Sequence, residues 1–359
     1  MAVRLQDVAD HAGVSVKTVS NVVHGHPAVS RPMRTKVQAS IEALGYVPNV
    51  SARSLRTGRS GLIGLAVPRL TDPYFCDVAA AVIDAASSRG LSVLVEQTGG
   101  EYLRENDVLL GRRPTIVDGL IFSPISVTQA ALDEVSPAVP LVLLGEHLMA
   151  SQRSRVAADN LAASTEAVAH LTGLGRRRVA AVGAKRGSTA ATAELRLAGY
   201  EKALTQAGLG LDGALQVPTE DFTRAAGIRA VDDLLSAGTT FDALFCFNDL
   251  LALGAMEALR RHGVEVPGDV AVAGFDDIEE GRHSTPGLTT VAVDLVVLAG
   301  AAVDSLVRRL DDPTAPDGDS MLVPHRLVVR GSTVPPPTAG PARQAPPATP
   351  TRLPSGSVK

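Results

Sequence analysis

Short apolar runs alternate with longer stretches of helical spacing between residues 62 and 310. Such runs are typical of strands buried on both faces, and their alternation with helices favours parallel sheets covered on both sides. The predicted strands cover residues 62–67, 91–96, 119–123, 141–144, 179–182, 243–246, 270–273 and 290–293, and the predicted helices include residues 77–88, 162–174, 195–207, 224–236, 250–262 and 295–310. This is too much α/β pattern for one sheet, so we expect two lobes with a ligand cleft between them.

The first 45 residues follow a different pattern, that of three short helices. Leu5, Val8, Ala9 and Ala12 have the spacing of one buried helical face, and Gly13 is suited to the turn that ends this helix. Ser15 is a good N-cap for a second helix with Val16, Val19, Val22 and Val23, and Ser30 and Pro32 begin a third with Val37, Ile41 and Leu44 that ends at Gly45. Two helices joined by a tight glycine turn predict a helix-turn-helix, whose second helix enters the major groove of DNA.

The exposed positions of the second helix are candidates for DNA contact. They are Ser15, Val16, Lys17, Thr18 and Asn21. Lys17 could donate to guanine, Asn21 could pair with adenine, and Val16 could touch a thymine methyl group. A phosphate contact is an equal alternative for each residue, and Lys17 and Asn21 could also be merely solvated.

The distribution of charge agrees with a nucleic-acid partner for this head alone. Residues 1–60 contain eight Lys and Arg against three Asp and Glu, a net charge of +5; since the whole chain carries −4, the remainder carries −9. A basic head on an acidic body favours a polyanion as the partner of the head.

Several other classes of protein are disfavoured. Cys76 and Cys246 are isolated among apolar residues, which predicts core thiols and neither a disulfide nor a zinc site. The chain starts with no secretory signal and has no membrane-spanning apolar run, so we expect a cytoplasmic protein and not a periplasmic solute-binding protein. The eight His are scattered and no phosphate loop or nucleophile elbow occurs, which argues against an enzyme, a metal or a cofactor.

The head and body together resemble the LacI/GalR family of bacterial repressors. In the head the resemblance lies in residues 5–9, 12–20, 29–30, 44–46, 48–49 and 52–58, and in the body in Asp72-Pro73-Tyr74-Phe75, Asp118-Gly119-Leu120-Ile121, Asn248-Asp249-Leu250-Leu251, Gly274-Phe275-Asp276-Asp277 and Val328-Val329-Arg330-Gly331. It covers residues 3–334. It implies an α/β fold with a three-helix helix-turn-helix head, a hinge helix, and a two-lobed body like that of the periplasmic binding proteins.

This resemblance also implies the division of the chain. Residues 1–48 would be the DNA-binding domain, 49–60 the hinge helix, and 61–334 the effector-binding and dimerisation domain. The chain would cross between the lobes three times, with an N-lobe of residues 61–160 and 291–322 and a C-lobe of residues 161–290 and 323–334. The tail, 335–359, is rich in Pro, Ala, Ser and Thr and predicts disorder; it has no leucine heptad, so we expect a homodimer.

Further DNA contacts follow from the resemblance. Paired hinges in this family become helical on DNA and lie in the minor groove, where Leu55 would be the wedge between base pairs. The implied contacts are Leu5, Ser15, Val16, Lys17, Thr18, Ser20, Asn21, Asn49, Ala52, Arg53, Leu55 and Arg56. Many members have Arg where this chain has Asn21, so its preferred operator would differ from the common one.

The effector cleft is implied in the same way, with two departures. Its lining would be Tyr74, Phe75, Ser123, Glu146, Glu194, Phe222, Asn248 and Asp276. Family members often carry Asp-Arg where this chain has Gly145 and Glu146, and an Arg at the position assigned to Glu194. We therefore expect two carboxylates in place of a cation, which disfavours an anionic effector such as a sugar phosphate and permits a neutral or cationic one. Core or dimer packing is the alternative for Tyr74 and Phe75, and a strand-end turn or cap is the alternative for Asp276.

These expectations combine into one mechanism. A homodimer places two recognition helices in successive major grooves of a palindromic operator, and a small, sugar-like effector changes the placement of the lobes and hence of the hinges. Repression is expected over activation from the habit of the family.

Overall fold

The computed structural model describes residues 3–23, 28–46, 59–112, 116–136, 138–148, 152–185 and 191–334. Residues 49–58 of the predicted hinge, with Asn49, Ala52, Arg53, Leu55 and Arg56, and the predicted tail lie outside these ranges. None of the helices in them has the length and apolar character needed to cross a membrane.

Three helices form the head: α1 (Leu5–Ala12), α2 (Val16–Val23) and α3 (Arg31–Leu44). Gly13 and Gly45 end α1 and α3 in the left-handed conformation, with φ of 59° and 60°. The Ser15 hydroxyl accepts the Thr18 N–H at 3.1 Å and so caps α2, as its position predicts. The core of the head consists of Val8, Ala9, Ala12, Val19, Val22, Val37 and Tyr46. The predicted three-helix head is confirmed.

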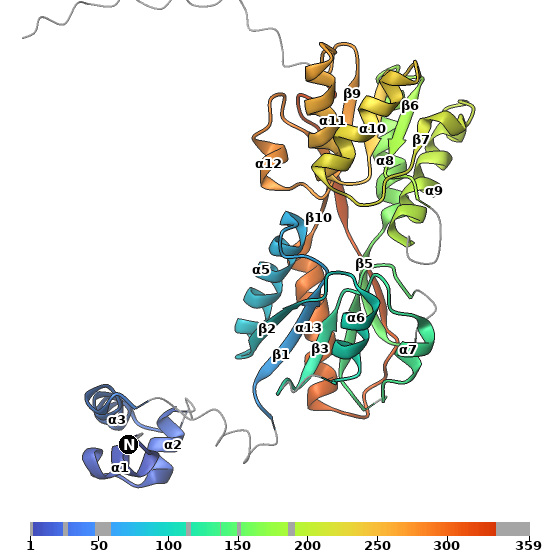
Figure 1. Ribbon diagram of the computed structural model, residues 1–359. Helices are drawn as coiled ribbons and strands as arrows, with labels where there is room; N and C mark the ends of the chain where they lie inside the picture. Colours follow the sequence, from blue (N-terminus) through green and yellow to red (C-terminus); the bar gives the residue numbers. More distant parts are fainter. Residues whose placement is uncertain are drawn as a thin grey trace, which may run out of the picture.

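A six-stranded, wholly parallel sheet forms the first lobe, which lies below the other in Figure 1. The strand order is β11-β5-β4-β3-β1-β2. These strands are β1 (Leu62–Val67), β2 (Ser92–Gln97), β3 (Gly119–Phe122), β4 (Leu141–Leu144), β5 (Ser154–Ala158) and β11 (Ser320–Val323). One face packs on α5 (Pro73–Ser87) and α13 (Leu295–Asp311), and the other packs on α6 (Tyr102–Leu109) and α7 (Gln129–Asp133).

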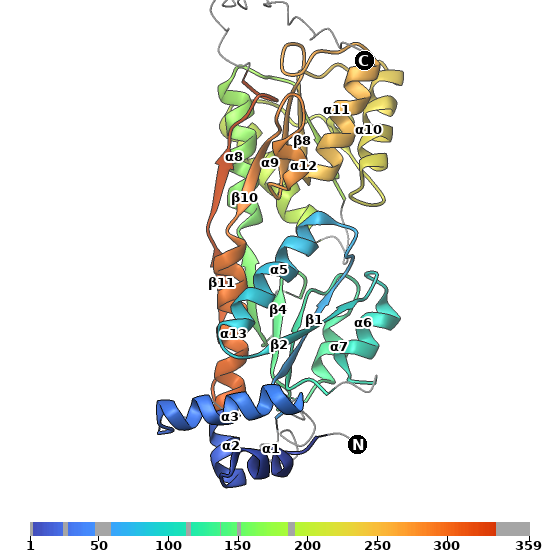
Figure 2. The same cartoon turned by 90° about the vertical axis from the view of Figure 1, so that its left-hand side faces the viewer.

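A second six-stranded sheet forms the other lobe, with the order β12-β10-β9-β8-β6-β7. All its strands are parallel except β12, which pairs antiparallel with β10. The strands are β6 (Val179–Val182), β7 (Gln216–Val217), β8 (Ala243–Cys246), β9 (Ala271–Phe275), β10 (Thr289–Val293) and β12 (His325–Val328). The helices are α8 (Asn160–Gly173), α9 (Ala191–Gln206), α10 (Arg224–Ser236), α11 (Asp249–Arg261) and α12 (Glu279–Arg282). Helix α8 pairs with α9 and α10 pairs with α11, and the two pairs flank the sheet (Figure 2).

The chain passes between the lobes three times: from β5 to α8, from β10 to α13, and from β11 to β12. The second passage lies after Val293 and not after residue 290, because the ladder of β10 with β12 continues to the pair Val293–His325. The third lies at Pro324, since β11 keeps Val323 in the first sheet. These positions differ by one to three residues from the approximate lobe limits that the resemblance implies.

The two-lobed α/β fold itself is confirmed, and the differences are local. Helix α5 begins at Pro73 and not at residue 77, because the Asp72 carboxylate caps it by accepting the Tyr74 N–H at 3.1 Å. The strands β5, β7, β11 and β12 were not predicted. Cys246 is a buried thiol as predicted, but Cys76 is exposed on α5, so its assignment to the core is wrong.

Candidate functional site

The exposed face of α2 is the candidate surface for DNA. Val19 and Val22 are buried in the head, which turns Val16 and Lys17 on the opposite side to solvent. Thr18, Ser20 and Asn21 are half-buried beside them, and so is Leu5 at the start of α1. The helix therefore presents the side chains that the sequence nominates for base or phosphate contact.

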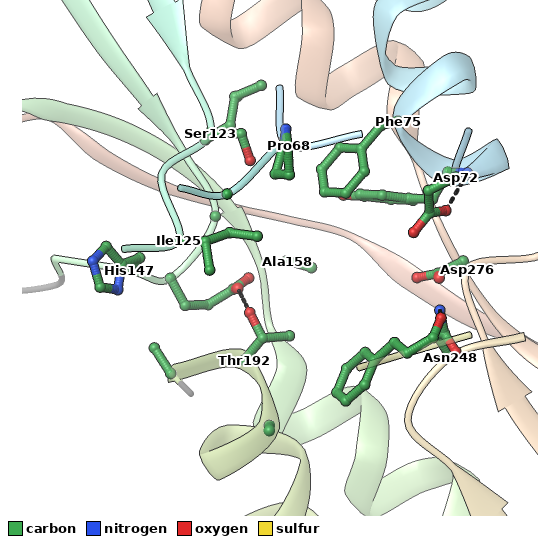
Figure 3. Close-up of a pocket in the computed structure, with 18 of the residues that line it drawn as sticks. Pro68, Asp72, Phe75, Ser123, Ile125, His147, Ala158, Thr192, Asn248 and Asp276 are labelled. Atoms are coloured by element: carbon green, nitrogen blue, oxygen red, sulfur yellow. Dashed lines mark hydrogen bonds between the residues drawn. The ribbon is translucent and has the colours of Figure 1, made fainter. Parts of the chain in front are cut away.

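A cavity of ≈ 340 Å³ lies between the lobes of the body (Figure 3). It is bordered by the first turns of α5 and α9 and by loops that follow β3, β4, β8 and β9. Seven of the eight residues predicted for the cleft line it: Tyr74, Phe75, Ser123, Glu146, Phe222, Asn248 and Asp276. These residues come from segments up to about 200 positions apart, which the two sheets bring together at one end.

The eighth predicted residue, Glu194, does not line the cavity, and Arg196 does. Helix α9 buries Ala193, Arg196 and Leu197 and leaves Glu194 exposed. The expectation of a cleft without a cation is therefore wrong. The signal was present in the sequence, because Arg196 shares the inward helical stripe with Ala193, Leu197 and Tyr200.

The Arg196 guanidinium is held on all sides. Its Nε donates to Asn160 Oδ1 at 2.7 Å, and its Nη1 donates to the carbonyl oxygen of Phe247. Its Nη2 lies 3.8 Å from the Asp276 carboxylate, and its plane stacks at 3.6 Å on the ring of Phe275. A guanidinium with this many partners forms a fixed part of the wall.

Asp276 ends β9 in an unusual backbone conformation. Its φ is 116° and that of Asp277 is 58°, both positive values that residues other than glycine rarely adopt. Burial raises the pKa of Asp276 well above its ordinary value, while the nearby Arg196 charge lowers it. The strand end thus turns sharply and directs a carboxylate into the cavity, which is the kind of strain that accompanies ligand sites.

Asn248 and Phe222 support each other at the same wall. Asn248 Oδ1 accepts the Leu251 N–H at 2.9 Å and caps α11, while its Nδ2 donates to the Phe222 carbonyl oxygen at 3.2 Å. The Phe222 ring meets Phe247 edge to face, with centroids 6.4 Å apart. The cap uses the amide oxygen, and the amide nitrogen has two donor hydrogens. Asn248 can therefore cap the helix, donate to Phe222 and still donate to a ligand.

Comparisons with known proteins identify the family. A model for bacterial regulatory proteins of the lacI family matches residues 4–49, and one for a periplasmic binding protein-like domain matches residues 168–333. The ribose operon repressor of Escherichia coli strain K12 is 33% identical over 330 residues, 91% of this chain and 99% of the relative. The chain belongs to the LacI family of bacterial regulatory proteins.

Two solved structures of LacI-family proteins share the fold. A transcriptional regulator from Sanguibacter keddieii is 45% identical over 77% of this chain and 100% of that chain, with a TM-score of 0.72. The lac repressor dimer bound to operator and the anti-inducer ONPF is 31% identical over 93% of this chain and 99% of that chain, with a TM-score of 0.74. The chain is accordingly a DNA-binding transcriptional regulator and not an enzyme.

Of the expected departures from the LacI-family pattern, Gly145 and Glu146 line the cavity, and Glu146 brings a charge to it. Glu146 follows β4 of the first lobe and is buried. Its Oε1 accepts from Asn160 Nδ2 at 2.5 Å, and its Oε2 accepts from the Thr192 hydroxyl at 2.7 Å, the contact drawn as a dashed line in Figure 3. Since Thr192 belongs to α9 of the second lobe, this carboxylate spans the cleft.

Besides Arg196, a second functionally placed residue, Asp249, was not predicted from the sequence. Asp249 is fully buried next to Asn248 and accepts from the Thr290 hydroxyl at 2.6 Å and from the Ile278 N–H at 3.0 Å. Burial raises its pKa to about 7. It ties α11 to the turn that carries Asp276 and so positions that wall. Its neighbour Gly274 has no room for a side chain, because a Cβ there would lie 2.2 Å from the Asp249 carboxylate.

Proposed function

We propose that the chain is a homodimeric repressor that binds a palindromic operator and whose operator affinity is set by a small, sugar-like effector in the interlobe cavity. The observation that carries this proposal is the combination of an exposed recognition helix with a cavity lined by aromatic, amide, carboxylate and guanidinium groups. The proposed domains are those of the family scheme, with the lobe limits moved to Val293 and Pro324.

The chemistry of the cavity suits a hydroxylated ring. Phe222 and Phe75 offer apolar faces, while Asp276 and Asn248 offer an acceptor and a donor for hydroxyl groups. The volume is within the range of small-molecule sites. The lac repressor structure is titled as a complex with an anti-inducer, and the Escherichia coli relative is named for the ribose operon, which supports a small effector of this kind.

Helix α13 gives a route from this cavity to the DNA-binding segment. Leu298 in its first turn lines the cavity. At its other end, the Leu310 carbonyl oxygen and the Asp311 carboxylate both accept from Arg59, which lies at the end of the predicted hinge; the contact to Asp311 is 2.9 Å. A change in the first turn of α13 would move Arg59 and therefore the end of the hinge. This is a linkage between two sites in the thermodynamic sense.

The first lobe carries a surface suited to a second copy of the chain. The neighbouring helices α5 and α13 expose Ile83 and Val296, which are 41% and 78% accessible. Apolar side chains grouped on neighbouring elements are typical of subunit interfaces. A two-fold dimer would also match the symmetry of a palindromic operator.

The proposal is tested by selecting bound sequences from random DNA with the purified chain. We expect a palindrome of about 14–20 base pairs with a flexible central step. Lys17→Ala should weaken binding to that sequence by about 1–3 kcal/mol if Lys17 contacts a base, because a base contact is lost. The matched control is Gln38→Ala, an exposed residue on α3 that bonds to Glu42 in its own helix.

Enrichment of no sequence, with and without candidate effectors, would contradict the operator proposal. A uniform loss of affinity for all sequences in Lys17→Ala would instead assign Lys17 to a phosphate.

A further inference from the structure

The charged side chains of the cavity fall into two groups. Near the mouth, the exposed Arg69 and Lys185 are balanced by the exposed Glu220 and the half-buried Asp221. Deeper in the cleft, Asp72, Glu146 and Asp276 accompany Arg196. Among the described lining residues, the charges at the mouth therefore balance, while the inner wall has three carboxylates for one guanidinium.

Arg196 has little capacity left for these carboxylates or for a ligand anion. Its three nitrogens are directed at Asn160, at the Phe247 carbonyl oxygen and at Asp276, and its face rests on Phe275. The positive charge is thus committed to one carboxylate. An anionic effector would have to displace Asp276 from it and would still face Asp72 and Glu146.

Glu146 is neutralised by no cation in the part of the chain that the structure describes. Its two hydrogen-bond partners, Asn160 Nδ2 and the Thr192 hydroxyl, are both neutral donors. Each carboxylate oxygen can accept a second hydrogen bond, and the side chain lines the cavity. A buried carboxylate with spare acceptor capacity is stabilised most by a cationic donor.

The three inner carboxylates also act on one another. Burial is the largest cause that raises the pKa of Asp276 and of Tyr74; the charges of Asp72 and Glu146 raise the pKa of Asp276 further, and those of all three carboxylates raise that of Tyr74. The negative potential is therefore concentrated on the inner wall. The charges of Arg69, Arg196 and Arg224 lower the pKa of Asp72. The hydrogen-bond partners of Glu146 among the described residues are both neutral. A positive charge on a ligand would therefore stabilise Glu146 more than it would stabilise Asp72.

We propose that Glu146 is a specificity-determining residue that selects an effector carrying a protonated amine together with hydroxyl groups. This inference rests on the proposed effector function of the cavity. The hydroxyl groups would bond to Asn248 and Asp276, and the ammonium group would bond to Glu146 where the first lobe meets α9. Sugar phosphates and sugar acids would be excluded by the same wall.

The test is a titration of the full chain with sugars matched in everything except charge. The probes are D-glucose, D-galactose and D-mannose, their 2-amino-2-deoxy forms, the N-acetylated forms of these amines, and the 6-phosphates, measured by calorimetry and by the shift in Tm. We expect at least one amino sugar to bind about tenfold or more tightly than its parent hexose. N-acetylation, which removes the charge and keeps the nitrogen, should abolish this advantage.

Two variants separate the charge from the shape of the site. Glu146→Gln keeps the volume and an acceptor, and should reduce the preference for the amine to about threefold or less while the parent hexose binds within about twofold of its original affinity. Thr192→Val removes the hydroxyl that bonds to Glu146 but keeps the carboxylate, and should retain the preference. Equal Tm values for the unliganded variants and the original chain would show that the fold is intact. If Glu146→Gln unfolds, Glu146→Asp tests the same charge and should keep part of the preference for the amine.

The inference is overturned if none of the amino sugars binds, if a 6-phosphate or a neutral hexose binds more tightly, or if Glu146→Gln keeps the preference. These outcomes leave the operator selection unchanged. A failure of the operator selection with a normal amine preference would instead contradict the proposed function alone.

Discussion

The two walls of the cavity differ in how they are held. On the C-lobe wall, Arg196, Asn248 and Asp276 are fixed to their surroundings by hydrogen bonds, a helix cap or a stacked ring. On the N-lobe wall, Phe75 and Ser123 touch the cavity, and within the described residues no hydrogen bond to the Ser123 hydroxyl occurs. The C-lobe wall is therefore preorganised, and the N-lobe wall, apart from Glu146 and the Asp72 cap of α5, is less firmly held.

This difference favours an order of events in binding. A ligand that contacts the preorganised wall first loses little binding free energy in ordering it, and the less firmly held wall then closes on the ligand. Because α13 begins at the N-lobe wall and ends at Arg59, closure of that wall is the movement that would reach the hinge.

The largest effect is expected from Gly254→Ala in α11. A Cβ at Gly254 would lie 2.0 Å from the carbonyl oxygen of Arg224 in α10, a backbone atom that no rotamer change can move. We expect a loss of more than about 4 kcal/mol in the free energy of unfolding, measured by denaturant titration. Gly300→Ala in α13 of the first lobe is the control, because nothing lies within 4 Å of its Cβ; it should stabilise by about 0.5–1 kcal/mol. Equal effects of the two changes would contradict the tighter packing of the C-lobe.

Arg196→Met should come next. It leaves the buried Asp276 carboxylate, Asn160 and the Phe247 carbonyl oxygen without their donor. We expect a loss of about 3–5 kcal/mol in the free energy of unfolding, as for other broken buried ion pairs. Adding Asp276→Asn removes the uncompensated charge and should recover part of the lost free energy of unfolding. A double variant no more stable than Arg196→Met would show that the ion pair does not organise the wall.

A pH dependence is expected from Asp249. Burial raises its pKa from the ordinary 3.8 to about 7, so the folded chain binds this proton more tightly than the unfolded chain. Its contribution to stability is then present below pH of about 4 and lost as the pH rises to about 7, on the order of 4 kcal/mol. Asp249→Asn should flatten this part of the profile of unfolding free energy against pH. Asp133→Asn, at an exposed carboxylate on α7, should not change it.

The smallest effect on stability is expected at the N-lobe wall. Ser123→Ala should change the free energy of unfolding by less than about 0.5 kcal/mol, because its hydroxyl supports no other described residue. It should nevertheless weaken effector binding by about 1 kcal/mol if the hydroxyl serves the ligand. Destabilisation by 2 kcal/mol or more would show that this wall is as firmly held as the other.

The strong periodic patterns were sufficient to predict most of the architecture. Strand β1 and helix α10 have the predicted limits, since an uninterrupted apolar run and a capped apolar stripe are local signals. Strand β11 carried no such signal, because three of its four residues are exposed at the sheet edge. Helix α5 started earlier than predicted because its cap, Asp72, precedes the apolar stripe by a turn.

The sequence by itself determined the head, the two-lobed fold, the family and seven of the residues that line the cavity, because each of these depends on spacing along the chain or on motifs that stay in order. It did not determine which charged side chain of α9 faces the cavity, and the resemblance placed Glu194 where the structure places Arg196. Nor did it indicate that Asp249 is buried, or that Glu146 bonds across the cleft to Thr192. The direction of a side chain on a helix depends on where the helix begins and on what packs against it, and only the tertiary structure decides both.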